Sequence, residues 1–446
     1  MANSNGWGDG AANNAIGWGQ GANNNIGWGK SHSLSSAGLT DIVGLTTDSD
    51  AQAFITAAAI TDATQQSAID TLVKGLKSDG IWSKMKAVYP FVTDNRNLLG
   101  YTEDFSNAYW SKGGGTTVTS NTTTAPDGTT TADTITLPNN GTIAATLTNT
   151  SSLQTTFTIY LRASSNTTIK IGFVSPSVVT TCNVTTSWQR FTITHTFSGV
   201  TYPQIYNDTG SSVTLFAWGA QAEYAATATT YQPIATTQQA FIAAQFKYNL
   251  KDPRDLDAAF RLVFNGGWTH SSNGATPNGT NGYADTKLNP SISLASQNSS
   301  HMSYYSRTNN DGTYIEMGSN IDAKRIVLHV KYNGDAYYDQ NDQTSGGRLS
   351  FSMAAINSSC FSLMSRTANN LQIGQVNGIN KGINTNTMTS AMPNANIYVG
   401  AFNNSTLIYT NRQCAFSSIG DGLTDTESAN LYTRVQAYQT ALSRQV

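Results

Sequence analysis

The side chains best suited to acid–base or metal chemistry gather in one short stretch of the chain. This densest cluster of charge consists of Asp252, Arg254, Asp255, Asp257 and Arg261. A functional interpretation makes it a metal or acid–base site, because neighbouring carboxylates can bind a cation or share a proton. The alternative, which we favour, is a turn and strand edge held by Asp–Arg hydrogen bonds.

No other group of residues has the spacing of a catalytic or metal centre. The five histidines share no ligand spacing. Residues 314–322 contain Glu316 and Asp322 but lack the closely alternating carboxylates with which a glycosidase cleaves a sugar chain. Residues 17–21 do not form a phosphate loop, because no strand precedes them and no Lys-Ser/Thr pair follows. We therefore expect no catalytic residue, no cofactor and no bound metal.

The three cysteines are far apart in the sequence, which favours neither a disulfide framework nor a metal ribbon. We expect each of them to be a small buried side chain. They are Cys182, Cys360 and Cys414.

Aromatic residues at regular spacing offer a different chemistry, the binding of a partner. Gly-Trp-Gly occurs three times, around Trp7, Trp18 and Trp28, with Ile16 and Ile26 between the copies. Burying one Trp is worth about 4–6 kcal/mol gross, whereas ordering about thirty small residues costs about 1–2 kcal/mol each. The segment is therefore expected to become ordered only when its tryptophans enter pockets of another protein. The alternative is a plain disordered tail.

Composition narrows the classes of partner. Charged residues make up 12% of the 446 residues, the net charge is −2, and no run of Lys or Arg occurs. We therefore expect no nucleic-acid partner, since nucleic-acid binding depends on basic clusters. The N-terminus lacks the basic and apolar regions of a signal peptide, and no apolar run has the length of a membrane span. We expect no membrane partner and assembly in a cytoplasm.

Helical patterns follow the Gly/Trp segment. Asp48 can cap a first helix, and the polar residues at 61–65 supply capping-box chemistry for a second, which Gly80 ends. The strongly apolar residues 81–92 come next, and their packing partner does not lie nearby in the sequence. Near the other end of the chain, Thr424 and Glu427 form a second capping box at the start of an amphipathic helix.

Residues 94–240 have the alternation of β-strands, as in 156–162 and 188–194. This region resembles the carbohydrate-binding-module-type jelly rolls of phage tail proteins. The resemblance is carried by the opening segments 97–110 and 125–133 and by the closing segments 215–223 and 231–233.

That resemblance implies a glycan site in which an aromatic ring stacks on a sugar ring. The candidates are Tyr101, Trp110, Trp188 and Trp218. We expect Trp188 and Trp218 to lie in the core of the jelly roll. Trp110 is the better candidate for an exposed aromatic residue.

Residues 246–264 have the same apolar character as residues 81–92 and read as their continuation. In phage structural proteins that this chain resembles, two such segments follow each other almost directly in the sequence. The jelly roll is therefore expected to be inserted into one host domain, built from residues 46–93 and 241–446. The strands of the second part and its final Gly-x-Gly-Leu-Thr-x-x-Glu helix resemble the concanavalin A-like, laminin-G-like fold.

These observations predict a mainly β protein with two β-sandwich (jelly-roll) domains, one inserted in the other. The expected parts are an extended Gly/Trp anchor (1–45), a short helical segment (46–93), the inserted jelly roll (94–240) and a concanavalin A-like sandwich with a C-terminal helix (241–446).

The whole chain resembles head-fibre or tail-fibre proteins of tailed bacteriophages, particularly those of Bacteroidetes hosts. The resemblance implies a non-enzymatic virion protein, anchored to capsid or tail proteins by residues 1–45 and turned towards a host surface glycan. A homotrimer is expected, with a dimer as the alternative. The alternative functions are a capsule-degrading depolymerase and a purely architectural capsid-cementing protein.

Overall fold

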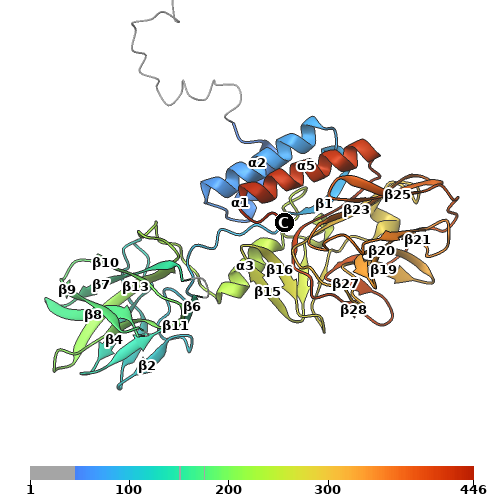
Figure 1. Cartoon of the computed structure of the whole chain (residues 1–446). Coiled ribbons are helices and arrows are strands. Elements are labelled where there is room, and N and C mark those ends of the chain that lie inside the picture. The colour runs from blue at the N-terminus through green and yellow to red at the C-terminus, as the bar shows by residue number, and fades with distance from the viewer. Residues whose placement is uncertain (1–45, 150–151, 175) are drawn as a thin grey trace, which may run out of the picture. The chain divides into compact units, whose positions relative to one another are not determined.

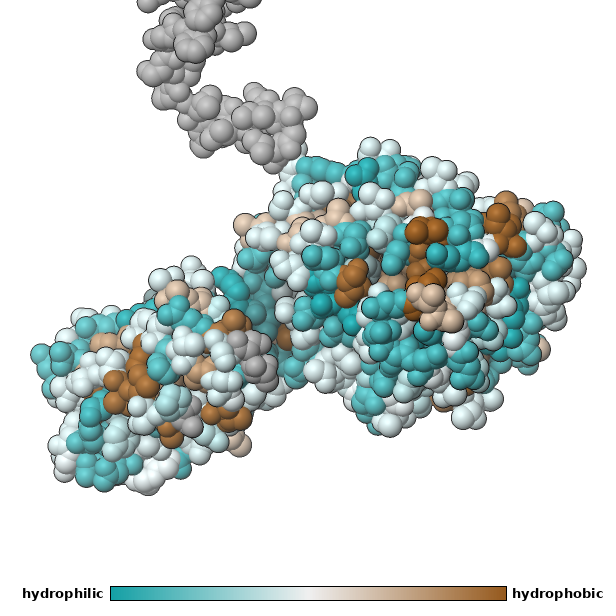
Figure 2. Space-filling model, in the orientation of Figure 1, coloured by the Kyte–Doolittle hydropathy of each residue, from teal (hydrophilic) through white to brown (hydrophobic). Residues whose placement is uncertain are grey.

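A computed structural model describes residues 46–149, 152–174 and 176–446 of the chain. Asp48–Val446 form one compact unit. Within the described residues there are 29 strands and five α-helices, so the predicted mainly β class is confirmed (Figure 1). Polar residues cover most of the face drawn in Figure 2, and apolar residues appear there only as separate small patches.

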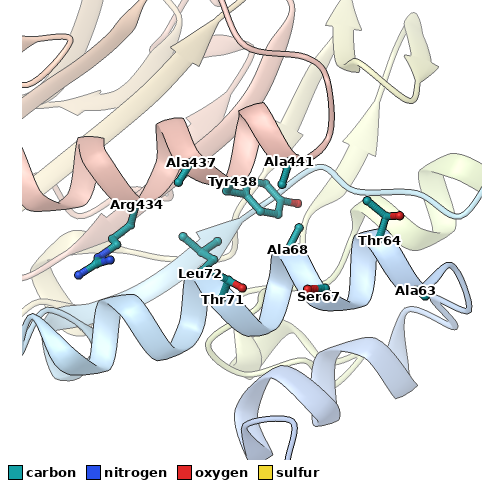
Figure 3. Close-up of a pocket in the computed structure, with 10 residues that line it drawn as sticks. All are labelled: Ala63, Thr64, Ser67, Ala68, Thr71, Leu72, Arg434, Ala437, Tyr438 and Ala441. Atoms are coloured by element: carbon teal, nitrogen blue, oxygen red, sulfur yellow. The ribbon is translucent and has the colours of Figure 1, made fainter. Parts of the chain in front are cut away.

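Three helices form a layer on one sheet: α1 (Ser49–Ala57), α2 (Ala63–Ser78) and α5 (Asp425–Ala441) (Figure 1). Their apolar side chains share a core with Tyr305 and Phe416 of the underlying strands. In the close-up of Figure 3, α2 and α5 lie side by side, and Ala68 and Leu72 of α2 are close to Tyr438 of α5.

The starts of these helices are set by local sequence, as predicted. The Asp48 carboxylate accepts a hydrogen bond from the Asp50 backbone N–H, and Asp62 accepts one from that of Gln65. The capping box predicted at 61–65 is only half formed, because the Gln65 side chain donates to the Thr93 carbonyl instead. At α5, the Thr424 hydroxyl and the Glu427 carboxylate form the full capping box. Helix α2 stops at Ser78, just before a glycine with a positive φ angle.

The helix-covered sheet has the strand order β15-β16-β29-β18-β23-β24-β25, and β1 pairs with β29. Because Tyr89 lies opposite Ser417, a strand from the start of the described chain is joined to one near its end. Ala87 and Tyr89 face the sandwich core, whereas Val88 faces the helices. The strands are β1 (Met85–Tyr89), β15 (Trp268–Ser271), β16 (Gly274–Pro277), β18 (Ser300–Ser306), β23 (Phe361–Ala368), β24 (Leu371–Val376), β25 (Ile379–Asn384) and β29 (Cys414–Gly420).

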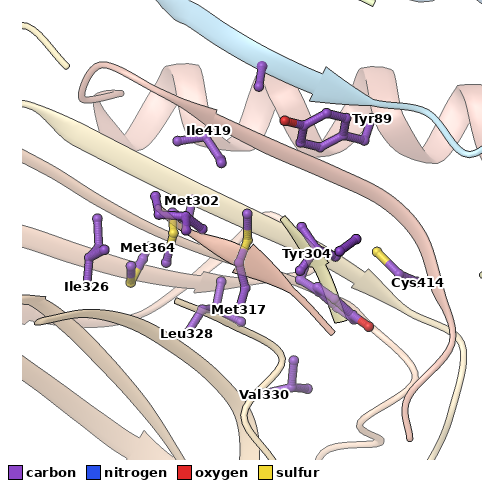
Figure 4. Packing of buried hydrophobic residues seen from close by; sticks show 14 of the residues in the cluster. Tyr89, Met302, Tyr304, Met317, Ile326, Leu328, Val330, Met364, Cys414 and Ile419 are labelled. Carbon is purple, nitrogen blue, oxygen red and sulfur yellow. The ribbon is translucent and has the colours of Figure 1, made fainter. Parts of the chain in front are cut away.

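A second sheet packs against the other face of the helix-covered sheet. Its order is β14-β17-β26-β19-β20-β21-β22, with β27 beside β19 and β28 beside β27. Met302 and Met364 of the helix-covered sheet meet Met317 and Leu328 of the second sheet in the sandwich core (Figure 4). The strands are β14 (Val263–Asn265), β17 (Tyr283–Asp285), β19 (Met317–Ile321), β20 (Lys324–Tyr332), β21 (Asp335–Asn341), β22 (Arg348–Ser352), β26 (Tyr398–Val399), β27 (Ala401–Asn403) and β28 (Ile408–Tyr409).

The strands between Ser111 and Glu223 pair only with one another within the described residues. They form two five-stranded sheets, ordered β10-β7-β13-β4-β3 and β2-β5-β12-β8-β9, and a small sheet of β6 and β11. Ile159 and Ile171, from the two larger sheets, share one core. The strands are β2 (Ser111–Gly113), β3 (Thr117–Thr123), β4 (Ala132–Leu137), β5 (Thr142–Ala144), β6 (Leu147–Asn149), β7 (Gln154–Ala163), β8 (Thr167–Phe173), β9 (Val178–Val184), β10 (Gln189–Thr196), β11 (Gly199–Thr201), β12 (Pro203–Tyr206) and β13 (Val213–Glu223).

The two chain segments that lead into and out of these strands are tied together. The Gln232 side-chain amide donates to the Asp94 carbonyl, and its oxygen accepts from the backbone N–H groups of Arg96 and Asn97. An insertion at a surface turn requires such closely spaced ends. The domain boundaries themselves stay a prediction.

The charge cluster of residues 252–261 is a salt-bridged turn, as we favoured. Arg254 pairs with Asp252, and Arg261 pairs with both Asp255 and Asp257. The segment includes the short 3-10 helix η2 (Asp257–Ala259) and follows α3 (Gln238–Phe246). No group of three or more His, Cys, Asp or Glu side chains in the described ranges is placed to hold a metal ion.

Two further expectations concern the cysteines and the membrane. All three cysteines are free and buried, as predicted. Among the helices that the structure describes, none is both long and apolar enough to cross a lipid bilayer.

Candidate functional site

Trp110 lies in the core of the 111–223 sandwich and is 2% exposed. Its indole N–H donates to the Tyr101 carbonyl at 2.9 Å, and its ring packs against Phe105 at 4.9 Å between centroids. The prediction of an exposed Trp110 is therefore wrong. The turns around Asp104 direct the ring inward, where its only polar group is satisfied.

Tyr101 lines a small surface hollow of about 170 Å³. Its backbone has a positive φ of 48°, and its ring contacts that of Tyr109 at 5.9 Å. The Tyr101 ring is tilted by 46° against the Tyr109 ring and is half-buried. Tyr101 and Trp110 therefore do not form the stacking surface that the resemblance implied.

Trp218 is buried, but in a small separate cluster with Ala125 and Ala132 and not in the core between the two sheets, and Trp188 is half-buried against the same cluster. The prediction of a position in the core of the jelly roll is therefore wrong for both residues. The Trp218 indole N–H donates to the Thr131 hydroxyl at 2.9 Å, and its ring packs on Tyr160 and Tyr231. Trp188 precedes β10 and donates its indole N–H to the Thr124 carbonyl at 3.0 Å. This bond fixes the ring while leaving part of it accessible.

Strand register brings Trp188 together with residues that the sequence did not single out. Across β10, β7 and β13, Arg190 lies opposite Tyr160, which lies opposite Trp218. Two residues further along β7, on the same face, Arg162 lies opposite Phe216. We call this surface the platform, and its accessible members are Tyr160, Arg162, Trp188, Arg190 and Phe216.

Two guanidinium groups hold the platform rings in place. Arg162 lies 4.6 Å from the Phe216 ring centroid and 5.4 Å from that of Trp188. Arg190 lies 5.5 Å from the Tyr160 centroid and donates to the Thr229 carbonyl and the Thr158 hydroxyl. Cation–π contacts of this kind fix both the cation and the ring.

Polar groups border the platform rings. The Nε–H groups of Arg162 and Arg190 have no hydrogen-bond partner within the described residues, but both nitrogens are buried and so are not open to a ligand. Threonine hydroxyls border the rings, and Thr134 lies opposite Phe216. Accessible ring faces beside hydroxyl and guanidinium groups suit a ligand that has both C–H faces and hydroxyl groups. None of the five platform residues is a carboxylate, so the platform itself holds no pair of carboxylates of the kind with which a glycosidase cleaves a sugar chain.

The 97–110 and 125–133 segments that carried the resemblance do not supply the platform. Tyr160, Arg162 and Phe216 lie in strands whose alternation was visible in the sequence. That alternation shows which residues share a face of one strand. It was the only signal for Tyr160 and Arg162, whereas Phe216 lies in residues 215–223, which carried the resemblance. The pairing that aligns the strands joins residues far apart in the chain.

No protein-family model and no curated protein sequence matches the chain. Solved structures that are similar in part include a family 11 carbohydrate-binding module from Clostridium thermocellum in complex with a mixed-linked tetrasaccharide. The identity is 10%, the match covers 29% of this chain and 96% of that one, and the TM-score is 0.23.

Two further solved structures are also similar to part of this chain, and the matches cover different shares of their own lengths. Domain 4 of an extracellular arabinanase from Geobacillus stearothermophilus, in complex with arabinotriose, is 16% identical over 38% of this chain and 80% of that one, with a TM-score of 0.28. An arabinose-bound α-L-arabinofuranosidase is 12% identical over 31% of this chain, with a TM-score of 0.26, and the match spans only 30% of that enzyme. Matches this partial assign no activity to the chain.

Proposed function

We propose that this chain is a non-enzymatic structural protein of a bacteriophage particle that binds a glycan of the host surface through the platform. The observation that carries the glycan-binding part is the row of half-buried rings held by Arg162 and Arg190. A sugar ring stacks its C–H face on such rings, while its hydroxyls bond to threonine and guanidinium groups.

The particle-binding part of the proposal rests on the Gly-Trp-Gly repeats and on the resemblance of the amino-acid sequence to phage fibre proteins. Residues 1–45 anchor the chain to capsid or tail proteins, and Trp7, Trp18, Trp28, Ile16 and Ile26 are the anchoring side chains. These five residues lie outside the described residues. A homotrimer multiplies a weak anchor through effective concentration, and a dimer does so less strongly.

The glycan-binding proposal predicts the effect of removing one ring. In Trp188→Ala, retention on purified host surface polysaccharide falls about tenfold, equivalent to about 1.4 kcal/mol, because the stacking surface is lost. Affinity electrophoresis of the full chain measures the retention. The matched control is Tyr202→Ala, which removes a 39% exposed aromatic ring of the same sandwich outside the platform. Equal retention of both variants and the parent protein contradicts the proposal.

Two experiments distinguish the proposed function from its alternatives, a depolymerase and an architectural capsid-cementing protein. A depolymerase releases new reducing ends from the polysaccharide, whereas a binding protein does not. Immunogold labelling of purified particles reports whether the chain is part of a virion and whether it sits on the capsid or the tail. Absence of label from every particle contradicts the virion proposal, and labelled particles whose polysaccharide retention is zero support the architectural capsid-cementing alternative.

A further inference from the structure

A second surface with the features of a binding site lies on the sandwich that carries the helices. It is a hollow of about 630 Å³ on the outer face of the second sheet, which we call the groove. This volume is in the range of small-molecule sites. The lining residues that matter below are Arg325, His329, Tyr332, Tyr337, Arg348 and Phe402.

Strand alternation places these side chains on one face. Ile326 and Leu328 of β20 enter the sandwich core, so Arg325 and His329 point to the opposite face. Within the hairpin of β20 and β21, His329 lies opposite Tyr337. The next strand, β22, brings Arg348 opposite Asp339. Most of the lining side chains thus stand on paired strands, and Thr313, Ile315 and Asn404 are contributed by loops.

The charge in the groove is unbalanced. Asp339 lies beneath it, fully buried, and accepts from Nε and Nη2 of Arg348 at 2.6 and 2.8 Å. Arg325 forms an ion pair with the same carboxylate at 2.9 Å. No other carboxylate is among the lining residues. Two guanidinium groups therefore share one carboxylate, and a second carboxylate from a ligand would balance the charge.

The rings of the groove are fixed in place. His329, Tyr332 and Tyr337 form a cluster with centroid separations of 5.9 to 6.0 Å. Arg348 lies 5.1 Å from the Tyr337 centroid, and Arg325 lies 5.1 Å from that of Phe402. Each cation thus lies beside an aromatic face, an arrangement that suits a ligand with both an anionic group and an apolar face.

His329 supplies a hydrogen-bond acceptor. Its Nδ1 lies 3.2 Å from the Tyr314 carbonyl, which can only accept, so Nδ1 donates. Burial lowers the pKa of His329 to about 4, so the ring is neutral at pH 7 and Nε2 is an acceptor. Within the part of the chain that the structure describes, Nε2 has no hydrogen-bond partner. A ligand hydroxyl can satisfy it.

We propose that the groove binds a saccharide unit that carries a carboxylate, with the carboxylate between Arg325 and Arg348, the sugar face on Tyr332, whose ring is nearly perpendicular to that of Tyr337, and a hydroxyl on His329 Nε2. A peptide added as an extra strand does not fit, because β20 is paired on both sides, with β19 and β21. This site is separate from the platform and does not depend on the function proposed for it.

The test is a calorimetric titration of the full chain with three acidic trisaccharides, of galacturonate, glucuronate and mannuronate, each beside its methyl ester. At least one acid should bind at least tenfold more tightly than its neutral ester, and the affinity should fall with added salt. Arg325→Gln should weaken that binding at least tenfold, since Arg348 remains to pair with Asp339. Tyr332→Ala should weaken it without changing the salt dependence.

The matched control is Arg254→Gln, which removes a cation whose side chain is 64% exposed and lies outside the groove, and should leave the affinity unchanged. Thermal unfolding of each variant verifies that it is folded.

The proposal is overturned if none of the acids binds, if acid and ester bind equally, or if Arg325→Gln binds as the parent does. Loss of acid binding in Trp188→Ala but not in Arg325→Gln also overturns it, because the acid then binds the platform. Tight binding of dextran sulfate by Arg325→Gln and parent alike identifies a general polyanion surface and overturns it too.

Discussion

Single buried polar residues carry much of the specificity of this fold. Glu316 and Arg412 are both fully buried and form an ion pair at 2.8 Å. The guanidinium also donates to the carbonyls of Thr308 and Asn310. Burial raises the pKa of Glu316, and the charge of Arg412 opposes that shift. The pair therefore fixes the path of the loop at 308–310, and its removal would leave a buried charge without a partner.

His301 makes folding stability depend on pH. The ring is fully buried, Nδ1 donates to the Asp421 carbonyl at 2.6 Å, and Nε2 accepts from the Ser418 hydroxyl at 3.2 Å. Burial lowers the pKa of His301 from 6.5 to about 4. The folded state thus binds fewer protons than the unfolded state, so this contribution is complete above pH 6.5 and is lost as the pH falls towards 4.

We predict that, when the pH is lowered from 7 to 5, His301 alone lowers the unfolding free energy by about 2 kcal/mol. In His301→Gln the slope of unfolding free energy against pH near pH 5 should therefore fall by about one proton. Urea unfolding at several pH values measures the slope. Ser418→Ala is the control, because it removes the Nε2 partner but keeps the imidazole. An unchanged slope in His301→Gln contradicts the prediction.

At the scale of elements, the helices are the part that local sequence determines most directly. The caps at Asp48 and Asp62 and the capping box at Thr424 involve residues within three positions of one another. For that reason the sequence was sufficient to place them.

The cap of α5 allows a quantitative prediction. Thr424→Ala should lower the unfolding free energy by about 1 kcal/mol, because the Glu427 backbone N–H loses its acceptor. Thr433→Ala is the matched control, since Thr433 lies on the exposed face within the same helix. That change should stay within about 0.5 kcal/mol of the parent. Urea unfolding compares the two, and equal effects contradict the role assigned to the cap.

Strand pairing limits what the sequence can predict about the sites. The alternation in residues 156–162 identifies a face of β7, but the row of Arg190, Tyr160 and Trp218 exists only once β10, β7 and β13 are in register. Trp110 and Trp188 show the same limit. Whether an aromatic residue beside a turn points inward depends on the turn and on a distant carbonyl acceptor. The groove likewise depends on the registers of two consecutive hairpins.

At the scale of the whole molecule, we propose that residues 94–240 form a separately folding insertion. Their strands pair among themselves, and Gln232 ties the entering and leaving segments together. Replacing residues 96–233 by a short Gly linker should therefore leave the remaining sandwich with its own cooperative unfolding transition. Residues 94–240 expressed alone should fold too. Calorimetry of the full chain should show both transitions, and loss of either transition in its separated part contradicts the insertion.

The pairing of β1 with β29 has a consequence for the order of events during synthesis. Strand β1 leaves the ribosome early, but its partner strand is made near the end of the chain, just before α5. The two-sheet sandwich with its helices therefore completes only once β29 and α5 have been made, whereas the strands between Ser111 and Glu223 have all their partners long before. A chain that terminates prematurely before Cys414 leaves β1 and the faces of α1 and α2 without their partners.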